Sequence, residues 1–133
     1  MTLSEVVLLY DVMSSEEANK ISAACKTMDA TLRIVRPYEY KVPIGFLSYG
    51  TEDQIQDYLI DSESVSAFER PMLVLAGFTN ERLHTFLATM RNQGASPIAL
   101  KAVLTEYNAV WDSISLYEEL KKEDEYMHSS SEN

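Results

Sequence analysis

The sequence is short of cysteine and of long apolar runs. Its one cysteine, Cys25, excludes an internal disulfide and fits a reducing compartment. No apolar stretch approaches the roughly 18 residues that a membrane helix needs. The first five residues place no basic charge before an apolar run, which argues against a secretory signal. We therefore expect a cytoplasmic protein that does not enter membranes.

Basic residues are also scarce. Eleven lysines and arginines stand against 21 aspartates and glutamates, so the net charge is −10. Such a chain repels phosphate backbones and anionic lipid surfaces at long range, and we expect no nucleic-acid partner. Part of the acidic excess lies near the end of the chain, where a solvated helix and tail are the expected setting. These residues are Glu118, Glu119, Glu123, Asp124, Glu125 and Glu132.

The length and composition predict one globular domain over residues 1–133. Apolar residues make up 46% of the chain and charged residues 24%, which is an ordinary globular balance. A chain of this size buries roughly two thirds of its unfolded surface, enough for a hydrophobic core. Residues 128–133 are polar and are expected to form a flexible tail.

Strand and helix patterns alternate along the chain. Compact apolar runs indicate strands, whereas apolar residues three or four apart after Ser14, Thr51 and Thr79 indicate capped helices. Residues 44–49 could be a strand or a packed loop. The expected strands are 5–10, 31–36, 72–76 and 97–103, and the expected helices are 15–28, 52–61, 80–93 and 113–127.

The two halves of the sequence resemble each other. Segments 5–61 and 71–127 superpose at an offset of 65 residues, with no gap until a shift of four before the last helix. At this offset Leu8 falls on Leu73, Ile21 on Phe86 and Cys25 on Met90. The matching roles predict an internal duplication.

Two tandem β-α-β-α units predict an α/β fold with a four-stranded, mostly parallel sheet flanked by helices. Strands 5–10 and 72–76 are apolar throughout, as strands buried on both faces are. Right-handed crossovers make the order 2-1-3-4 accessible, but the sequence leaves the strand order open. The alternative is a ferredoxin-like α+β fold, which would expose one face of the sheet.

The second half resembles a known bacterial family, a domain of unknown function numbered 3783. The residues that carry the resemblance are Leu73–Phe78, Ile98–Thr105, Asn108, Trp111 and Leu116–Lys122. The family pattern is Lys-Ala-Val-Leu-Thr-Pro-Thr-Asn-x-x-Trp, and here Glu106 and Tyr107 replace the Pro-Thr pair. The resemblance covers less than half of the chain and implies no established activity.

The loop after the fourth strand holds the best candidate for a binding site. Lys101 could hold an anion, Thr105 and Asn108 could give directional hydrogen bonds, and Trp111 a stacking surface. Ligands of parallel α/β sheets sit beyond the carboxyl ends of strands, where Asp11 also follows the first strand. The alternative is that Thr105 and Asn108 build a turn and Trp111 anchors the loop.

Other chemistry has little support in the sequence. His84 and His128 have no paired ligand at metal-binding spacing, so we predict no metal site and no cofactor. Cys25 lies on an apolar helix stripe and is expected to be a packed, inert thiol. We therefore expect a non-catalytic binding or protein-interaction module of a bacterial cytosol, with a homodimer as one form. The alternative is a small enzyme or ligand-binding domain for an anionic or nucleotide-like metabolite.

Overall fold

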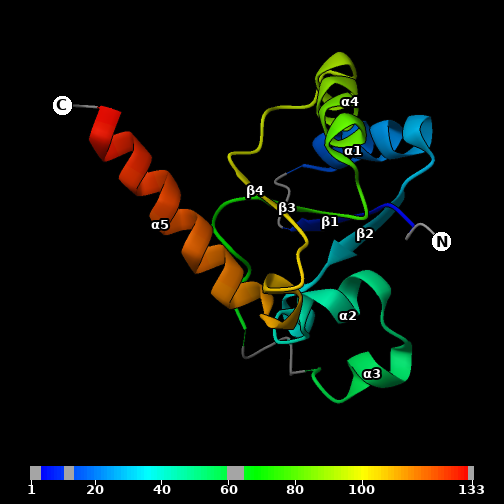
Figure 1. Ribbon diagram of the computed structural model, residues 1–133, viewed down its shortest axis with the longest axis vertical. Coiled ribbons are helices and arrows are strands. Elements are labelled where there is room, and N and C mark those ends of the chain that lie inside the picture. The colour runs from blue at the N-terminus through cyan, green and yellow to red at the C-terminus, as the bar shows by residue number, and fades with distance from the viewer. Residues whose placement is uncertain (1–3, 11–13, 60–64, 132–133) are drawn as a thin grey trace.

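The computed structural model describes residues 4–10, 14–59 and 65–131, and it is an α/β fold with one four-stranded sheet (Figure 1). The strands are β1 (Val6–Tyr10), β2 (Thr31–Val35), β3 (Met72–Ala76) and β4 (Leu100–Val103). The helices are α1 (Ser15–Met28), α2 (Ile44–Tyr49), α3 (Glu52–Gln56), α4 (Asn80–Asn92) and α5 (Ser113–Ser131), with short 3-10 helices η1 (Pro37–Glu39) and η3 (Asn108–Val110).

The sheet is mostly parallel, and its order is β2-β1-β3-β4, which right-handed crossovers allow. β1 runs parallel to β2, and β3 runs parallel to β4. The two pairs meet in the middle, where β1 and β3 are antiparallel and Leu8 lies opposite Val74. The sheet is therefore two parallel β-α-β units joined along one antiparallel seam.

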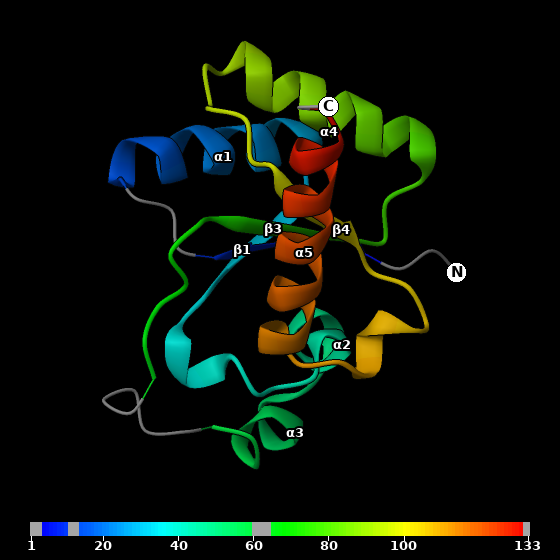
Figure 2. The same ribbon diagram turned by 90° about the vertical axis from the view of Figure 1, so that its left-hand side faces the viewer.

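This seam decides where the helices lie. A right-handed crossover places its helix on a face set by the strand direction and by the direction of the step. Both are reversed between the two units, so α1 and α4 lie side by side on one face of the sheet (Figure 2). The opposite face is left to α2 and the beginning of α5, which pack against β1 and β4.

Each face of the sheet has its own core, because β1 and β3 are buried along their whole length. Val7 and Leu75 point to the face of α1 and α4, where Phe86 is fully buried. Leu8 and Val74 point to the opposite face. Alternate side chains of both central strands thus fill two apolar layers, as the continuous apolar runs predict.

The gap-free superposition of the two halves is wrong within the strands. It pairs Leu8 with Leu73, but these side chains lie in the cores on opposite faces of the sheet. The second strands are also out of step, since Val6 pairs with Thr31 and Met72 with Leu100, separations of 25 and 28 residues. The duplication stays a prediction. An alignment of the two halves requires gaps both between the first strand and the helix of each unit and between that helix and the second strand.

The predicted caps are present at the helix starts. The hydroxyl groups of Ser14, Thr51 and Thr79 accept hydrogen bonds from the third residue of each helix, at 3.1 to 3.3 Å. Residues 44–49 form a helix, α2, rather than a strand or loop, because Ile44 and Leu47 are buried three residues apart on one side.

Two helix ends differ from the sequence prediction. α3 ends at Gln56, short of the expected 61, and residues 60–64 lie outside the described part of the chain. α5 continues to Ser131, so residues 128–131 are helical where a flexible tail is expected. The division of the chain into one domain and a tail stays a prediction.

The segment that leads into β3 is held by an aromatic stack. The ring of Phe68 lies between those of Tyr40 and Tyr117, with centroids 4.0 Å away on either side and nearly parallel planes. The Phe68 amide donates to the Tyr40 hydroxyl at 3.1 Å, and the Arg70 amide donates to the Tyr117 hydroxyl at 3.2 Å. This stack ties the connection between the two units to η1 and α5.

An ion pair ties the beginning of β1 to the α1–α4 layer. The Arg82 guanidinium on α4 donates to both carboxylate oxygens of Glu5, and at 2.8 Å to the carbonyl of Met28 at the end of α1. The hydrogen bond from Arg82 holds the pKa of Glu5 below its ordinary value, although burial opposes this.

We expect this pair to make the stability depend on pH. Because the pKa of Glu5 is lower in the folded state, its contribution is complete above the unfolded value of about 4.5 and is lost as pH falls below it. Glu5→Gln should lower the free energy of unfolding by about 1 kcal/mol at pH 7 and by less at pH 3. Urea unfolding at both pH values measures this, with Glu81→Gln on the exposed side of α4 as the control. An equal loss at both pH values would contradict it.

Candidate functional site

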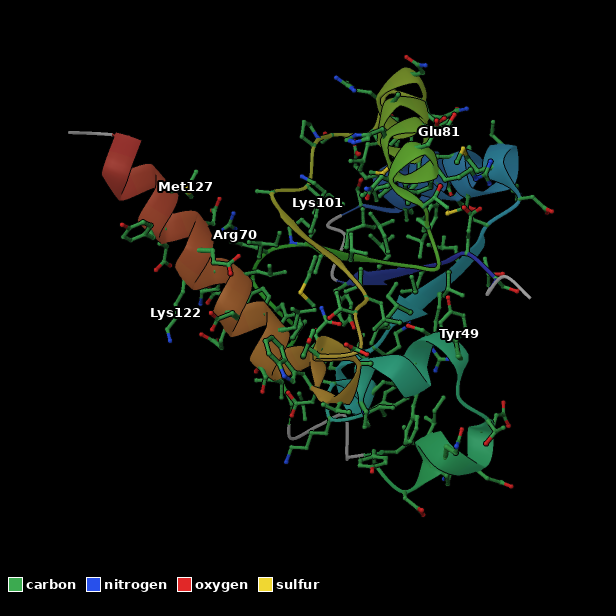
Figure 3. All side chains as sticks on the ribbon, in the orientation of Figure 1. Tyr49, Arg70, Glu81, Lys101, Lys122 and Met127 are labelled. Carbon is green, nitrogen blue, oxygen red and sulfur yellow. The ribbon has the colours of Figure 1, made fainter. Side chains whose placement is uncertain are left out.

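Among the candidate residues that the structure describes, Lys101 lies apart from the other three. Lys101 lies on β4 and its ammonium donates to the carbonyl of Ile98 at 2.8 Å, beside Leu87 and Met90 of α4. Figure 3 shows it well apart from Tyr49, on α2. Asp11 lies outside the described residues. Lys101 thus faces the α1–α4 side of the sheet and is not brought to the loop after β4.

Thr105 and Asn108 close a turn on themselves. The Asn108 side chain accepts from the Thr105 amide at 2.8 Å and donates to the carbonyl of Val103 at 3.0 Å. The Thr105 hydroxyl accepts from the amides of Tyr107 and Asn108, both at 3.2 Å. Their polar atoms hold the chain reversal between β4 and η3, so the turn reading accounts for both residues.

Trp111 joins this loop to α2. Its carbonyl accepts from the amide of Ile44 at 2.9 Å, while its side chain keeps 39% of its surface exposed. Gly45 allows η3 and α2 to approach closely, since a Cβ at that position would lie 3.2 Å from both the Cβ and the carbonyl oxygen of Ala109. The loop after β4 is thereby seated against the first half of the chain.

An apolar groove lies where these segments meet. It has a volume of about 570 Å³, within the range of roughly 300–1,000 Å³ that is typical of ligand sites. Phe46 and Tyr49 of α2, Tyr58 beyond α3, and Ala109 and Val110 of η3 line it. We call this the α2–η3 groove.

The sequence gives a partial signal for this groove. The aromatic stretch 44–49 and the loop 104–112 each stand out in the pattern, but they lie about 60 residues apart and only the fold joins them. Tyr49 at the end of α2 lines the groove, whereas Tyr40 after η1 is buried in the aromatic stack. Val110, with 76% of its surface exposed, has no sequence signal of its own.

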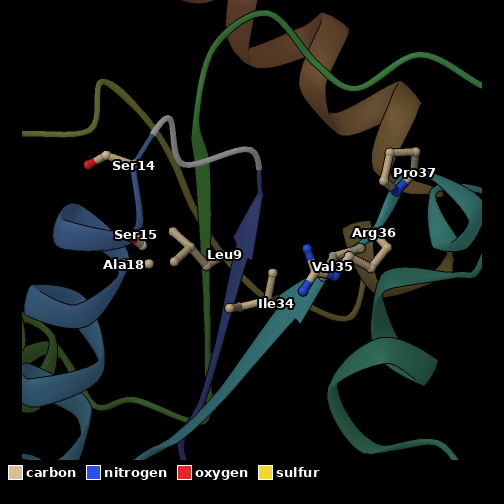
Figure 4. A pocket seen from close by; sticks show the side chains of 8 residues that line it. All are labelled: Leu9, Ser14, Ser15, Ala18, Ile34, Val35, Arg36 and Pro37. Carbon is tan, nitrogen blue, oxygen red and sulfur yellow. The ribbon is translucent and has the colours of Figure 1, made fainter.

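A second hollow lies at the carboxyl ends of β1 and β2 (Figure 4). It measures about 220 Å³ and is lined by Leu9, Ile34 and the first turn of α1, with Arg36 at its edge. The hydroxyl of Ser14 already accepts from the Glu17 amide there, and Arg36 is exposed. This hollow is smaller and less apolar than the α2–η3 groove.

The thiol of Cys25 is buried between helix and sheet, with 2% of its surface exposed. Burial raises its pKa to about 11, so the reactive thiolate is disfavoured at neutral pH. Within the described residues no three histidine, cysteine or carboxylate side chains gather as metal ligands. In the same part of the chain, every helix is too short or too polar to cross a bilayer.

The family described as Domain of unknown function (DUF3783) matches residues 71–127, which confirms the resemblance of the second half. No curated protein and no solved structure matches the chain. The matched segment contains β3, α4, β4 and η3, so it supplies Ala109 and Val110 to the groove. The α2 and α3 walls come from outside it.

Proposed function

We propose that this protein is a non-catalytic binding module that docks a partner in the α2–η3 groove. The observation that carries the proposal is the apolar lining, in which Phe46, Tyr58 and Val110 surround about 570 Å³ of open volume. A complex gains about 25 cal/mol of binding free energy for each Å² of apolar surface that the partner removes from water.

The chemistry of the lining supports binding over catalysis. Its polar side chains are the amide of Gln54 and the hydroxyls of Tyr49 and Tyr58. The Tyr49 hydroxyl already donates to the carbonyl of Ser4 at 2.7 Å, and the Gln54 carbonyl oxygen accepts from the Thr51 amide at 2.9 Å. A groove with such a lining offers area and shape, whereas acid–base catalysis needs a proton donor or acceptor aimed at the substrate.

The proposal can be tested with an uncharged apolar probe. In an NMR titration with indole, we expect the amide shifts to change at residues 43–58 and 108–111 and to stay near their free values along α1 and α4. Val110→Ser should weaken indole binding several-fold, because it removes apolar surface from the rim.

The control is Tyr126→Ser, which removes an equally exposed apolar side chain (72%) on α5. Both variants change surface residues, so their free energies of unfolding should match that of the wild type within about 0.5 kcal/mol. Indole shifts centred on α4 and β4, or binding that is unchanged by Val110→Ser, would overturn the proposal.

A further inference from the structure

The two segments that wall the α2–η3 groove carry charge of one sign. Residues 44–58 and 104–112 contain five carboxylates and no lysine, arginine or histidine. The nearest basic residue along the chain is Lys41, two positions before Pro43 at the groove. The carboxylates are Glu52, Asp53, Asp57, Glu106 and Asp112.

Most of these carboxylates are exposed to solvent. Glu52, Asp53, Asp57 and Glu106 are exposed, and Asp112 is half-buried, accepting from the Ser115 amide at 2.8 Å. In the described part of the chain, none of the five has a lysine or arginine nitrogen within 4.0 Å, whereas Glu5, Glu17 and Glu39 are paired elsewhere. The two segments that wall the apolar groove therefore carry negative charge that no lysine or arginine pairs with in the described residues.

The backbone around the groove determines how a peptide can bind. Its walls are the helices α2 and α3 and the 3-10 helix η3, whose main-chain amides donate to helical turns or, for Ile44, to the carbonyl of Trp111. They offer no free strand edge to an extended peptide, so recognition must come from side chains. Packing of this kind suits a helix that places one apolar face into the groove.

From the shape and the charge together we infer that the groove binds a basic amphipathic helix. Its apolar face lies on Phe46, Tyr58 and Val110, and its lysines or arginines are attracted by the carboxylates of the two segments that wall the groove. This inference rests on the proposed function and adds the chemical class of the partner. These acidic segments also speed the encounter with a basic partner and repel acidic ones.

A second copy of this chain is a poor occupant of the groove. Each copy carries a net charge of −10, so the acidic segments of one would face a surface of the same sign. The end of α5 does expose Tyr126 and Met127, but Glu123 and Glu125 lie beside them on the same helix. Because Tyr126 and Met127 are nevertheless exposed, the test must distinguish self-association from the binding of a basic helix.

The test uses two synthetic helices of about 18 residues, long enough to form a helix on binding. Both place leucine and tryptophan on one face. One carries lysine on the other face, and its partner carries glutamine at the same positions. Fluorescence anisotropy of the labelled peptides measures their affinity for the full chain, at low salt and at about 0.5 M salt.

The charge variant is Asp57→Lys with Glu106→Lys, and its matched control is Glu123→Lys with Glu125→Lys. The control sites lie between the labelled Lys122 and Met127 on the far part of α5 (Figure 3). Both pairs change the net charge by the same amount. We expect the lysine peptide to bind the wild type roughly tenfold more tightly than the glutamine peptide, and to lose roughly tenfold in the groove variant and less than twofold in the control.

Each remaining outcome decides between the two proposals. Equal binding of both peptides, weakened by Val110→Ser, would overturn the charge inference and leave the groove as the binding site. Equal losses in both charge variants would show that only net charge matters, which also overturns it. Binding that Val110→Ser does not change, or no binding of either peptide, would overturn the inference. A dimer that Val110→Ser dissociates would assign the groove to a second copy instead.

Discussion

Replacing Phe68 by alanine should lower the free energy of unfolding by about 3 kcal/mol. The substitution removes a ring that is stacked at 4.0 Å on both Tyr40 and Tyr117. Each aromatic pair stabilises the fold by roughly 0.5–1.5 kcal/mol beyond the contribution of its buried area. It also leaves the two tyrosine rings facing a cavity. Urea unfolding followed by tyrosine and tryptophan fluorescence measures the loss.

Phe78→Ala is the matched control for the stack. Phe78 is also half-buried, but it has one tilted ring neighbour, Phe86, at 5.5 Å. We expect the Phe68 variant to be the less stable of the two by about 1–2 kcal/mol, because Phe68 has a tilted neighbour of its own, Tyr10 at 5.9 Å, and two closely stacked rings besides. Equal losses in the two variants would show that the stack adds nothing beyond buried area.

Replacing Gly77 by alanine should cost about 3 kcal/mol. Gly77 has φ = +82°, where an L-residue is strained by roughly 1–2 kcal/mol. A Cβ there would also lie 2.5 Å from the carbonyl oxygen of Ser4 and 2.6 Å from the Tyr49 hydroxyl oxygen. Those two atoms are hydrogen-bonded to each other at 2.7 Å, so neither can retreat without breaking that bond.

Gly94→Ala separates the two causes. Gly94 has nearly the same φ, +85°, but a Cβ there would lie at an ordinary 3.9 Å from a side-chain carbon of Lys20. We expect it to cost about 1 kcal/mol, the conformational part alone. Thermal or urea unfolding of both variants compares them. A Gly77 loss no larger than the Gly94 loss would show that the contact with Ser4 relaxes freely.

The sequence was enough to predict the strands and the caps, because these depend on local patterns. The order of the sheet is compatible with right-handed crossovers, but the sequence left it open. The direction of β3 against β1 depends on something else. Both strands are apolar at every position, so no alternation of side chains fixes which way they run. The connection through α2, α3 and the Phe68 segment sets that direction, and its path follows from long-range packing.

The candidate site illustrates the same limit. The spacing of Thr105 and Asn108 is compatible with ligand binding and with a closed turn, and only the hydrogen bonds distinguish the two. Lys101 lies four residues from Thr105, but its side chain points to the α4 side of the sheet. The groove could not be predicted because Phe46 and Val110 become neighbours only after α2 docks on η3.

The antiparallel seam has a consequence for the order in which the chain folds. Each parallel pair joins strands 25 or 28 residues apart, whereas the seam joins residues as distant as Val6 and Ala76. Closing the longer loop costs more chain entropy, so the β-α-β units can begin to form before they meet. We expect the meeting of the two partly formed halves to come later, and this step buries β1 and β3 together. A nascent first half would have to keep the apolar edge of β1 from other chains until β3 arrives.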